Sequence, residues 1–390
     1  MNYNEEYFET GLYRMNTRCE KWDLMREENH DASMIPLWVA DMDFPSPPEV
    51  QQALLNRAAH PTYGYTEPLA DDDQAVIDYW QRRHNLTIAR EDITMLPCVV
   101  TGLKLAIQAV TNPGDGVVLM SPVYGPFAGS VEATGRTKVD CPLVKDAKGH
   151  YTMDLPKIEK ALQQGAKAVM LCNPHNPASR AWSKEELLAL LKLTRQYHVL
   201  LISDEIHADF VYAPATFTPM LSLETENVLS LCAASKTFNL AGLQQALCLC
   251  KDEQLRAKFV HVMEAAGVRS GNIFALEATR AAYQHGDAWL DGLLAYLDGS
   301  RKMLTAWVQE HLPKAVLTPI EATYLAWLDL SAYGYTTEEL MEKAKAAGVY
   351  FTAGTFFGAE TGEYHLRVNF GTPRHILFEG MARLEKALQE

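Results

Sequence analysis

The sequence predicts an α/β protein whose mainly parallel β-sheet lies between helices, followed by a smaller α+β domain. Two observations support this prediction: short apolar runs alternate with helical patterns from about residue 94, and the pattern changes after about Asp287. Strands that are apolar along their whole length are typical of a parallel sheet covered on both faces. We expect three parts: an N-terminal segment (1–48), a large domain (49–286) and a small C-terminal domain (287–390).

Composition excludes several classes of function. The chain has 390 residues, is 48% hydrophobic and carries a net charge of −14, with no basic run that nucleic acid or an anionic membrane would require. No stretch of about 18–20 continuous apolar residues predicts a membrane span. The seven cysteines form no CxxC pair and lie mostly in apolar runs, which predicts a reducing compartment, the cytoplasm, and no metal site.

The elements follow in chain order. The N-terminal segment lacks a clean period and ends at Pro47-Pro48, after which a helix begins near Glu49. A turn-rich loop that contains Tyr65 separates this helix from a second one, and by its local pattern Tyr65 is an ordinary loop aromatic. The next strands are expected at 117–120, 168–172, 199–203, 228–232 and 246–250, with helices at 103–110, 155–164 and 185–197. The last part is expected to hold a long helix from 287 towards 311, strands at 324–330 and 365–369, and a helix at 376–388.

Polar side chains follow three of the expected strands. Asn176 lies in a proline-bounded loop after the first, Asp204 and His207 follow the second, and Ser235-Lys236 follow the third. Because ligands bind at the carboxyl ends of the strands in open parallel sheets, we expect these side chains to share one site. A lysine just past a buried strand is poorly solvated, which suits an amine that forms a Schiff base.

These residue types suit pyridoxal 5′-phosphate (PLP). PLP requires a lysine for its imine, a carboxylate for its pyridine nitrogen and a donor to its phenolate oxygen. The start of the helix after Cys98, with the amides of Val99 and Val100, offers donors for a phosphate, and Tyr124 follows another strand and offers an aromatic ring.

Each of these residues also has an ordinary structural interpretation. Asp204 suits a helix N-cap, Asn176 a turn, His207 a buried histidine and Tyr124 simple packing. Arg367, in an apolar strand of the small domain, suits either a structural ion pair or a bidentate clamp for an α-carboxylate. Their order at consecutive strand ends favours the functional interpretation.

With these residues the chain resembles fold-type I PLP-dependent enzymes of the class I/II aminotransferase superfamily, and within it the MalY/PatB family of cystathionine β-lyase-like C–S lyases. The resemblance covers essentially the whole chain. The motifs that carry it are Trp38-Val-Ala-Asp-Met-Asp-Phe44, Tyr63-Gly-Tyr65, Asn173-Pro-His-Asn-Pro177, Ser203-Asp-Glu-Ile-His207, Ser235-Lys-Thr-Phe-Asn239 and Leu366-Arg-Val-Asn369.

The resemblance implies a role for each site residue. Lys236 binds PLP and moves the Cα proton, Asp204 pairs with the pyridine nitrogen, and Tyr124 stacks on the ring. Arg367 binds the substrate carboxylate. Asn176 supports the phenolate side of PLP and contacts the substrate, and His207 supports the phenolate side. Ser235 and the amides of Val99 and Val100 bind the phosphate. Tyr65 binds the phosphate of the neighbouring subunit in a homodimer.

Four positions depart from the family pattern. Cys98 and Ser179 replace glycines, Ala233 stands where a phosphate-binding serine is common, and Gln244 stands where many aminotransferases carry an arginine. The last departure favours the lyase branch. The other three put the loop geometry and the affinity for PLP in question.

The resemblance implies a PLP-dependent carbon–sulfur β-lyase that converts L-cystathionine or another S-substituted L-cysteine to a thiol, pyruvate and ammonia. A class I/II aminotransferase is the alternative, because both reactions begin with the same Cα deprotonation. A second alternative is a protein of this fold with a mainly regulatory or interaction role. The sequence does not identify the leaving thiol.

Overall fold

A seven-stranded β-sheet forms the centre of the larger part of the molecule. The computed structural model describes residues 2–269 and 271–389, and the strands of this sheet lie side by side in the order β2-β10-β9-β8-β7-β3-β4. The strands are β2 (Ile93–Leu96), β3 (Gly116–Leu119), β4 (Thr137–Asp140), β7 (Ala168–Cys172), β8 (Leu200–Asp204), β9 (Val228–Cys232) and β10 (Ala246–Leu249).

The sheet is mainly parallel, as predicted. The pairs β9–β8, β8–β7, β7–β3 and β3–β4 are all parallel, whereas β10 runs antiparallel to both β9 and β2. β10 reaches its place from β9 without a full crossover helix, because only the short helix α9 (Ala234–Thr237) and a 3-10 turn separate them. The strands β2 and β4 were not predicted.

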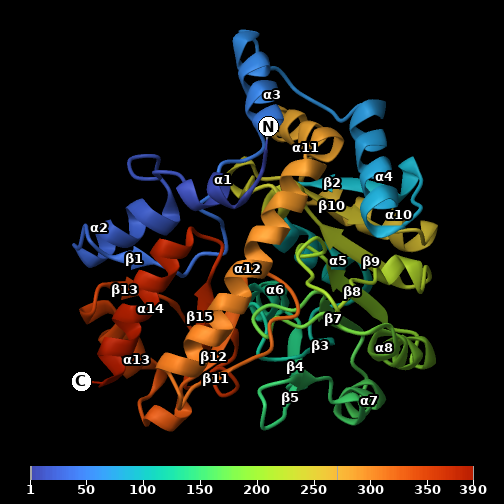
Figure 1. The fold of residues 1–390 in the computed structure, drawn as a ribbon. Helices are drawn as coiled ribbons and strands as arrows, with labels where there is room; N and C mark the ends of the chain where they lie inside the picture. The colour runs from blue at the N-terminus through green and yellow to red at the C-terminus, as the bar shows by residue number, and fades with distance from the viewer. Residues whose placement is uncertain (1, 270, 390) are drawn as a thin grey trace.

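Helices cover both faces of the sheet (Figure 1). Alternate residues of each strand point to opposite faces: in β7, Met170 belongs to the apolar cluster that includes residues of α5, α6 and α10, while Val169 and Leu171 belong to the other cluster, which includes residues of α4, α7, α8 and α11. This double burial explains the continuous apolar runs. The helices are α4 (Ala70–His84), α5 (Val99–Val110), α6 (Pro126–Ala133), α7 (Leu155–Gln163), α8 (Lys184–Gln196), α10 (Glu253–Ala265) and α11 (Ile273–His285).

The C-terminal part is a smaller α+β unit. A 25-residue helix, α12 (Asp287–His311), runs from the helices above the large sheet to a four-stranded antiparallel sheet in the order β11-β12-β15-β14 (Figure 1). These strands are β11 (Val316–Leu317), β12 (Leu325–Asp329), β14 (Thr352–Ala353) and β15 (His365–Asn369), and they pack with α13 (Thr337–Ala346) and α14 (Arg374–Gln389).

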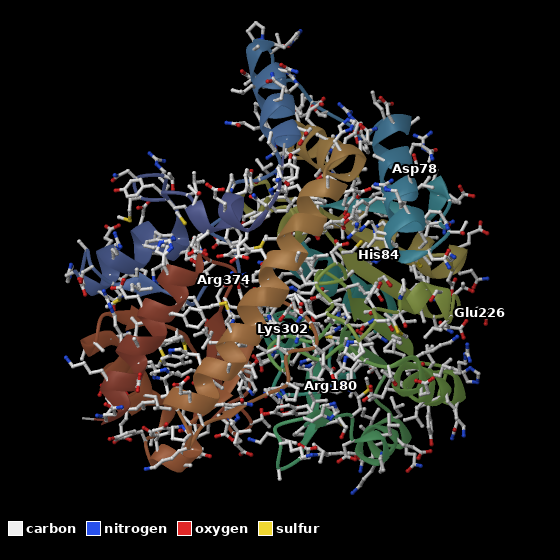
Figure 2. All side chains as sticks on the ribbon, viewed as in Figure 1. Asp78, His84, Arg180, Glu226, Lys302 and Arg374 are labelled. Carbon is white, nitrogen blue, oxygen red and sulfur yellow. The ribbon has the colours of Figure 1, made fainter. Side chains whose placement is uncertain are left out.

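The N-terminal segment lies beside this smaller unit (Figure 1). It holds α1 (Glu5–Thr10), a π-helical turn η1 (Glu20–Leu24), α2 (Met25–Asn29) and β1 (Ile35–Pro36), which pairs in parallel with β13 (Val349–Tyr350). Arg374, labelled in Figure 2, joins α1 to α12 because its guanidinium bonds both Glu5 and the hydroxyl of Ser300. These elements are too short to show a period in the sequence.

A third helix, α3 (Pro48–Ala59), projects at the top of the view and packs on α11 (Figure 1). The loop after it leaves Tyr65 fully exposed. Two short strands, β5 (Val144–Lys145) and β6 (Tyr151–Thr152), form a hairpin at the other end. No helix among the described residues has the length and apolar composition that a membrane crossing requires.

The predicted element boundaries were close but not all correct. The second strand of the expected site ends at Asp204, not at Ser203, so the carboxylate is the last residue of the strand. The helix after Cys98 begins at Val99, not at Leu103, and its N-cap, Cys98, has an extended backbone. Lys236 lies in the helical turn α9.

Candidate functional site

Three adjacent parallel strands bring the predicted polar residues to one edge of the sheet. Cys172 of β7 pairs with Asp204 of β8, and Asp204 pairs with Leu231 of β9, so the three strands end at the same level. Asn176 follows β7, and Lys236 follows β9. The sheet register therefore places the amide, the carboxylate and the amine of the sequence prediction at neighbouring strand ends.

Asp204 is a buried acid without a cationic partner. Its Oδ1 accepts a hydrogen bond from the Ile206 amide at 3.1 Å, and it forms no ion pair among the residues that the structure describes. Burial raises the pKa of this carboxyl to about 7, although the Ile206 amide and the nearby Lys236 act in the opposite direction. No helix follows Asp204, which excludes the N-cap interpretation.

The Lys236 amine is held by a backbone carbonyl of the N-terminal segment. Nζ donates to the oxygen of Ala40 at 2.6 Å, and the hydroxyl of the buried Tyr324 donates to the same oxygen at 3.0 Å. Burial lowers the pKa of Lys236, while Asp41 opposes this shift. A lysine whose neutral form is favoured in this way is suited to act as a nucleophile or base.

The residues from Trp38 to Phe44, here called the strap, link the two sheets across the site. Asn239, three residues after the lysine, donates to the carbonyls of Met42 (2.8 Å) and Phe44 (3.1 Å) and accepts from the Met42 amide. From the smaller unit, Asn369 donates to the carbonyls of Val39 and Asp41. The sequence motifs contained these residues, but no local pattern indicated that they meet.

Arg367 lies on β15 and reaches both the strap and the large sheet. Nη2 donates to the Trp38 carbonyl at 2.6 Å and to Thr352 Oγ1 at 3.1 Å, and Nη1 donates to Asn176 Oδ1 at 3.3 Å. Nε has no partner among the described residues, and the guanidinium lies 5.0 Å from the ring centre of Phe357. Burial lowers its pKa to about 10, and no carboxylate neutralises it among the described residues. This excludes the structural ion-pair interpretation.

The start of α5 offers free backbone donors. Its N-cap, Cys98, makes no capping hydrogen bond to the helix, so the first amides, including those of Val99 and Val100, lack a capping partner. The helix dipole adds positive potential at this end. Cys98 has φ −161°, an extended conformation that any residue adopts, so the replacement of glycine at this position costs no backbone strain.

The other predicted residues lie in distinct environments. Tyr124 is partly buried, burial raises its pKa, and Arg367 acts on it electrostatically. His207 is buried with no partner for Nδ1 among the described residues, and burial lowers its pKa to about 3, so the ring is neutral. Ser235 directly precedes the lysine in α9. Tyr65 lies outside this cluster, fully exposed on the loop after α3.

Two of the departures carry positive φ angles. Ser179 has φ 51°, in the left-handed region that favours glycine, and its hydroxyl donates to the Leu325 carbonyl. Gln244 has φ 58° and bonds the Ala241 carbonyl through its own side chain. Ala233 is extended and caps α9 without a side-chain hydrogen bond.

Comparison with known proteins identifies the family. Residues 32–382 match the family described as aminotransferase class I and II. The chain is 39% identical to cystathionine beta-lyase PatB of Bacillus subtilis over 98% of this chain and 99% of that protein. The chain belongs to the class I and II aminotransferase family. Within it, the chain belongs with PatB and with protein MalY of Escherichia coli, to which it is 30% identical over 98% of each chain.

Solved structures agree with this family assignment. Cystalysin of Treponema denticola, whose crystal structure contains a pyridoxal 5′-phosphate cofactor, superposes with a TM-score of 0.94 at 30% identity over 98% of each chain. The chain therefore has the fold-type I architecture of this PLP-dependent family.

The residues present fit PLP. The buried Asp204 lacks a cation, which a protonated pyridine nitrogen would supply, and the uncapped start of α5 lacks an anion, which a phosphate would supply. The amine of Lys236 lies at the neighbouring strand end. The unpaired acid of Asp204 and the uncapped start of α5 thus each have a complement in one part of this cofactor.

Proposed function

We propose that this class I and II aminotransferase family member is a PLP-dependent carbon–sulfur β-lyase. It splits L-cystathionine or another S-substituted L-cysteine, with one water, into a thiol, pyruvate and ammonia. The observation that carries the proposal is the arrangement of Lys236, Asp204 and Arg367, an amine, a buried acid and an unpaired guanidinium. Its occurrence in a chain 39% identical to a cystathionine beta-lyase gives the reaction class.

PLP, when bound, supplies an electron sink that stabilises negative charge at the substrate Cα. The chain supplies the remaining functions. Asp204 would hold a proton on the pyridine nitrogen, and the amides of Val99 and Val100 with Ser235 would hold the phosphate. Asn176 and His207 would support the phenolate oxygen, and Tyr124 would cover the ring.

Two side chains handle the substrate itself. The guanidinium of Arg367 binds the α-carboxylate through two parallel hydrogen bonds, for which its planar geometry is suited, and Asn176 orients it through the contact at 3.3 Å. Lys236, its pKa lowered by burial, takes the proton from Cα. Departure of the thiolate from Cβ then completes the elimination.

The test is the release of pyruvate and free thiol from L-cystathionine by the purified protein with PLP. We expect equal amounts of both products from the unchanged chain and none from a Lys236→Ala variant. Consumption of a keto acid acceptor without thiol release would instead establish the alternative, an aminotransferase.

We further propose a homodimer in which Tyr65 reaches the phosphate in the neighbouring subunit's site. Supporting this, Tyr65 is fully exposed in the single chain, and Leu55, Tyr63 and Leu69 nearby are also exposed. If the site is shared, mixing inactive Tyr65→Phe and Lys236→Ala subunits restores one intact site per heterodimer, or about a quarter of the full activity. No recovery after subunit exchange would refute the sharing.

The predicted division at 49–286 and 287–390 also remains a proposal. The seven-stranded sheet lies within the first range and the four-stranded sheet within the second, which supports it. Cytoplasmic location is proposed on the cysteines, all seven of which are free thiols.

A further inference from the structure

A buried acid–histidine pair is bonded to the helical turn that carries the lysine of the site. His84, the last residue of α4 (Figure 2), has its Nε2 3.0 Å from Oδ1 of Asp209. The other carboxylate oxygen, Oδ2, accepts a hydrogen bond from Thr237 Oγ1 at 2.6 Å. Thr237 directly follows Lys236 and is the last residue of α9. One side chain therefore joins the pair to the turn that holds the amine.

The pair is enclosed by the protein. The side chains of His84 and Asp209 are each 7% exposed, and Thr237 is buried. The rings of Trp80 and Phe217 contact the imidazole, with ring centres 4.7 and 5.2 Å from its own. Burial acts to raise the pKa of Asp209, but its polar neighbours, His84 first among them, outweigh burial, so the pKa is lowered and the anion is favoured.

Asp209 also belongs to the segment that carries the acid of the site. It lies five residues after Asp204, the end of β8. The chain between them is folded into a tight turn, in which the Ala208 amide donates to the Glu205 carbonyl at 3.0 Å. The bond from Asp209 to α9 therefore ties the segment of Asp204 to the segment of Lys236. In the proposed function these two groups act at different positions of one cofactor, which requires a fixed separation between them.

A second side chain of the same segment holds α9 from another element. Asn239 donates to the strap carbonyls of Met42 and Phe44, whereas Thr237 donates to Asp209. Stability alone does not account for the buried pair, because the cost of removing two charges from water offsets most of their attraction. The pair is instead suited to give the turn one defined position.

We propose that Asp209 and His84 are positioning residues for the amine of Lys236. Asp209 acts through Thr237, and His84 acts through Asp209 by fixing its carboxylate. This inference deepens the proposed function, because it names the residues that keep the amine at the separation from Asp204 that proton transfer at Cα requires.

The test replaces Thr237 with valine, which has nearly the same shape and lacks the hydroxyl. We expect Thr237→Val to lower kcat of the holoenzyme for L-cystathionine at least about tenfold and to change KM, which depends on Arg367, less than about twofold, because a displacement of about 1 Å in a catalytic group costs up to about 100-fold. Thr237→Ser keeps the hydroxyl and should keep at least about half of kcat. Thr194→Val is the matched control, since Thr194 is a buried threonine of α8 whose hydroxyl donates to the Leu191 carbonyl at 3.1 Å.

His84→Gln tests the histidine separately. This variant leaves the bond between Asp209 and Thr237 and removes the charge beside the carboxylate. We expect kcat to fall about two- to fivefold with KM unchanged, a smaller loss than in Thr237→Val, because the tie to α9 remains. An unchanged kcat would overturn the part assigned to His84. His84→Gln also replaces Thr237→Val in both measurements if the latter does not fold.

A second measurement needs no turnover. The full-length apoprotein is treated with pyridoxal, an aldehyde without the phosphate, and the product is reduced with borohydride. Peptide mass spectrometry then compares the label at Lys236 with that at Lys302, which is 64% exposed. We expect Lys236 to be labelled at least about threefold more slowly in Thr237→Val than in Thr237→Ser or Thr194→Val, since only the first loses the tie.

The outcomes separate this inference from the lyase function. Slower labelling and a lower kcat in Thr237→Val alone support the inference. Equal labelling of Lys236 in the three variants, or an equal loss of kcat in Thr194→Val, overturns it. Absence of thiol release from the unchanged protein, with the difference in labelling retained, overturns the lyase function alone.

Discussion

Replacing Lys21 with methionine tests whether a buried ion pair holds the strap. Lys21 is fully buried, and its Nζ lies 2.7 Å from Asp43 Oδ2. Removing one partner of a buried pair typically costs about 3–5 kcal/mol, because the other charge remains buried. Asp43 keeps Arg14 at 2.9 Å and the indole of Trp22 at 2.7 Å, so we expect a loss at the low end, about 3 kcal/mol.

Urea unfolding followed by circular dichroism measures this loss as a lower midpoint at unchanged slope. Lys302→Met is the matched control, since Lys302 on α12 (Figure 2) is 64% exposed and its pair with Asp298 should contribute less than about 0.5 kcal/mol. Adding Asp43→Asn to Lys21→Met should recover about 1 kcal/mol, because it removes the carboxylate that lost its ammonium partner while Arg14 keeps its pair with Asp41 at 2.7 Å. A loss below about 1 kcal/mol for Lys21→Met, or one equal to the control, would refute the reasoning.

The same variant should raise KM for the amino acid, because the strap supplies the Trp38 carbonyl that holds Arg367 at 2.6 Å. A large loss of stability with an unchanged KM would show that the strap stabilises the fold without positioning the arginine. Lys302→Met should change neither quantity.

Three further results are expected. Arg367→Lys should raise KM for the amino acid at least about tenfold with PLP still bound, since a lysine cannot make two parallel hydrogen bonds to a carboxylate; an unchanged KM would exclude the carboxylate clamp. Ser179→Ala should destabilise the protein by about 1 kcal/mol more than Ser179→Gly in urea unfolding, because both variants lose the hydroxyl bond but only alanine keeps a Cβ at the positive φ; equal losses would show that the backbone at 179 is unstrained. Burial raises the pKa of Asp204 from 3.8 to about 7. Between these pH values the folded apoprotein keeps a proton that the unfolded chain has lost. The stability that the protonated carboxyl contributes is therefore fully present below about pH 4 and is lost as the pH rises through 7. Asp204→Asn should therefore remove about 2–3 kcal/mol of the decline in apoprotein stability between pH 5 and pH 8, and an unchanged pH profile would contradict the raised pKa.

Much of the fold could be predicted because its signals are local. Continuous apolar runs identified β7 and β9 to the residue, and the helix expected at 185–197 differs from α8 by one residue at each end. The parallel order of β7, β8 and β9 then brought the residues at their ends together without any knowledge of the loops. This is why a site could be predicted from residues that are up to about 60 positions apart.

The remaining features depend on contacts that no local pattern reveals. The reversal of β10 is set by its place between β9 and β2, and β4 has mostly exposed side chains, so neither feature left a periodic signal. The strap has no period because its backbone bonds to side chains from both sheets, Asn239 and Asn369 among them, and not to a neighbouring strand. Its sequence could be matched to a family, but its function as a link could not be read from it.

The electrostatics of the site follow from burial without partners. Burial raises the pKa of Asp204 to about 7, lowers that of Arg367 to about 10 and lowers that of Lys236, so each group is held in surroundings that disfavour its charged form. In a purely structural role these groups would be paired with one another, since unpaired buried charges destabilise a fold. A ligand that carries the opposite charges binds the folded chain and stabilises it in proportion to its affinity. The same unpaired state that costs the apoprotein stability is therefore what gives the site its affinity for a cofactor and an amino acid, and the strap contributes the backbone carbonyls that hold the amine of Lys236 and the guanidinium of Arg367.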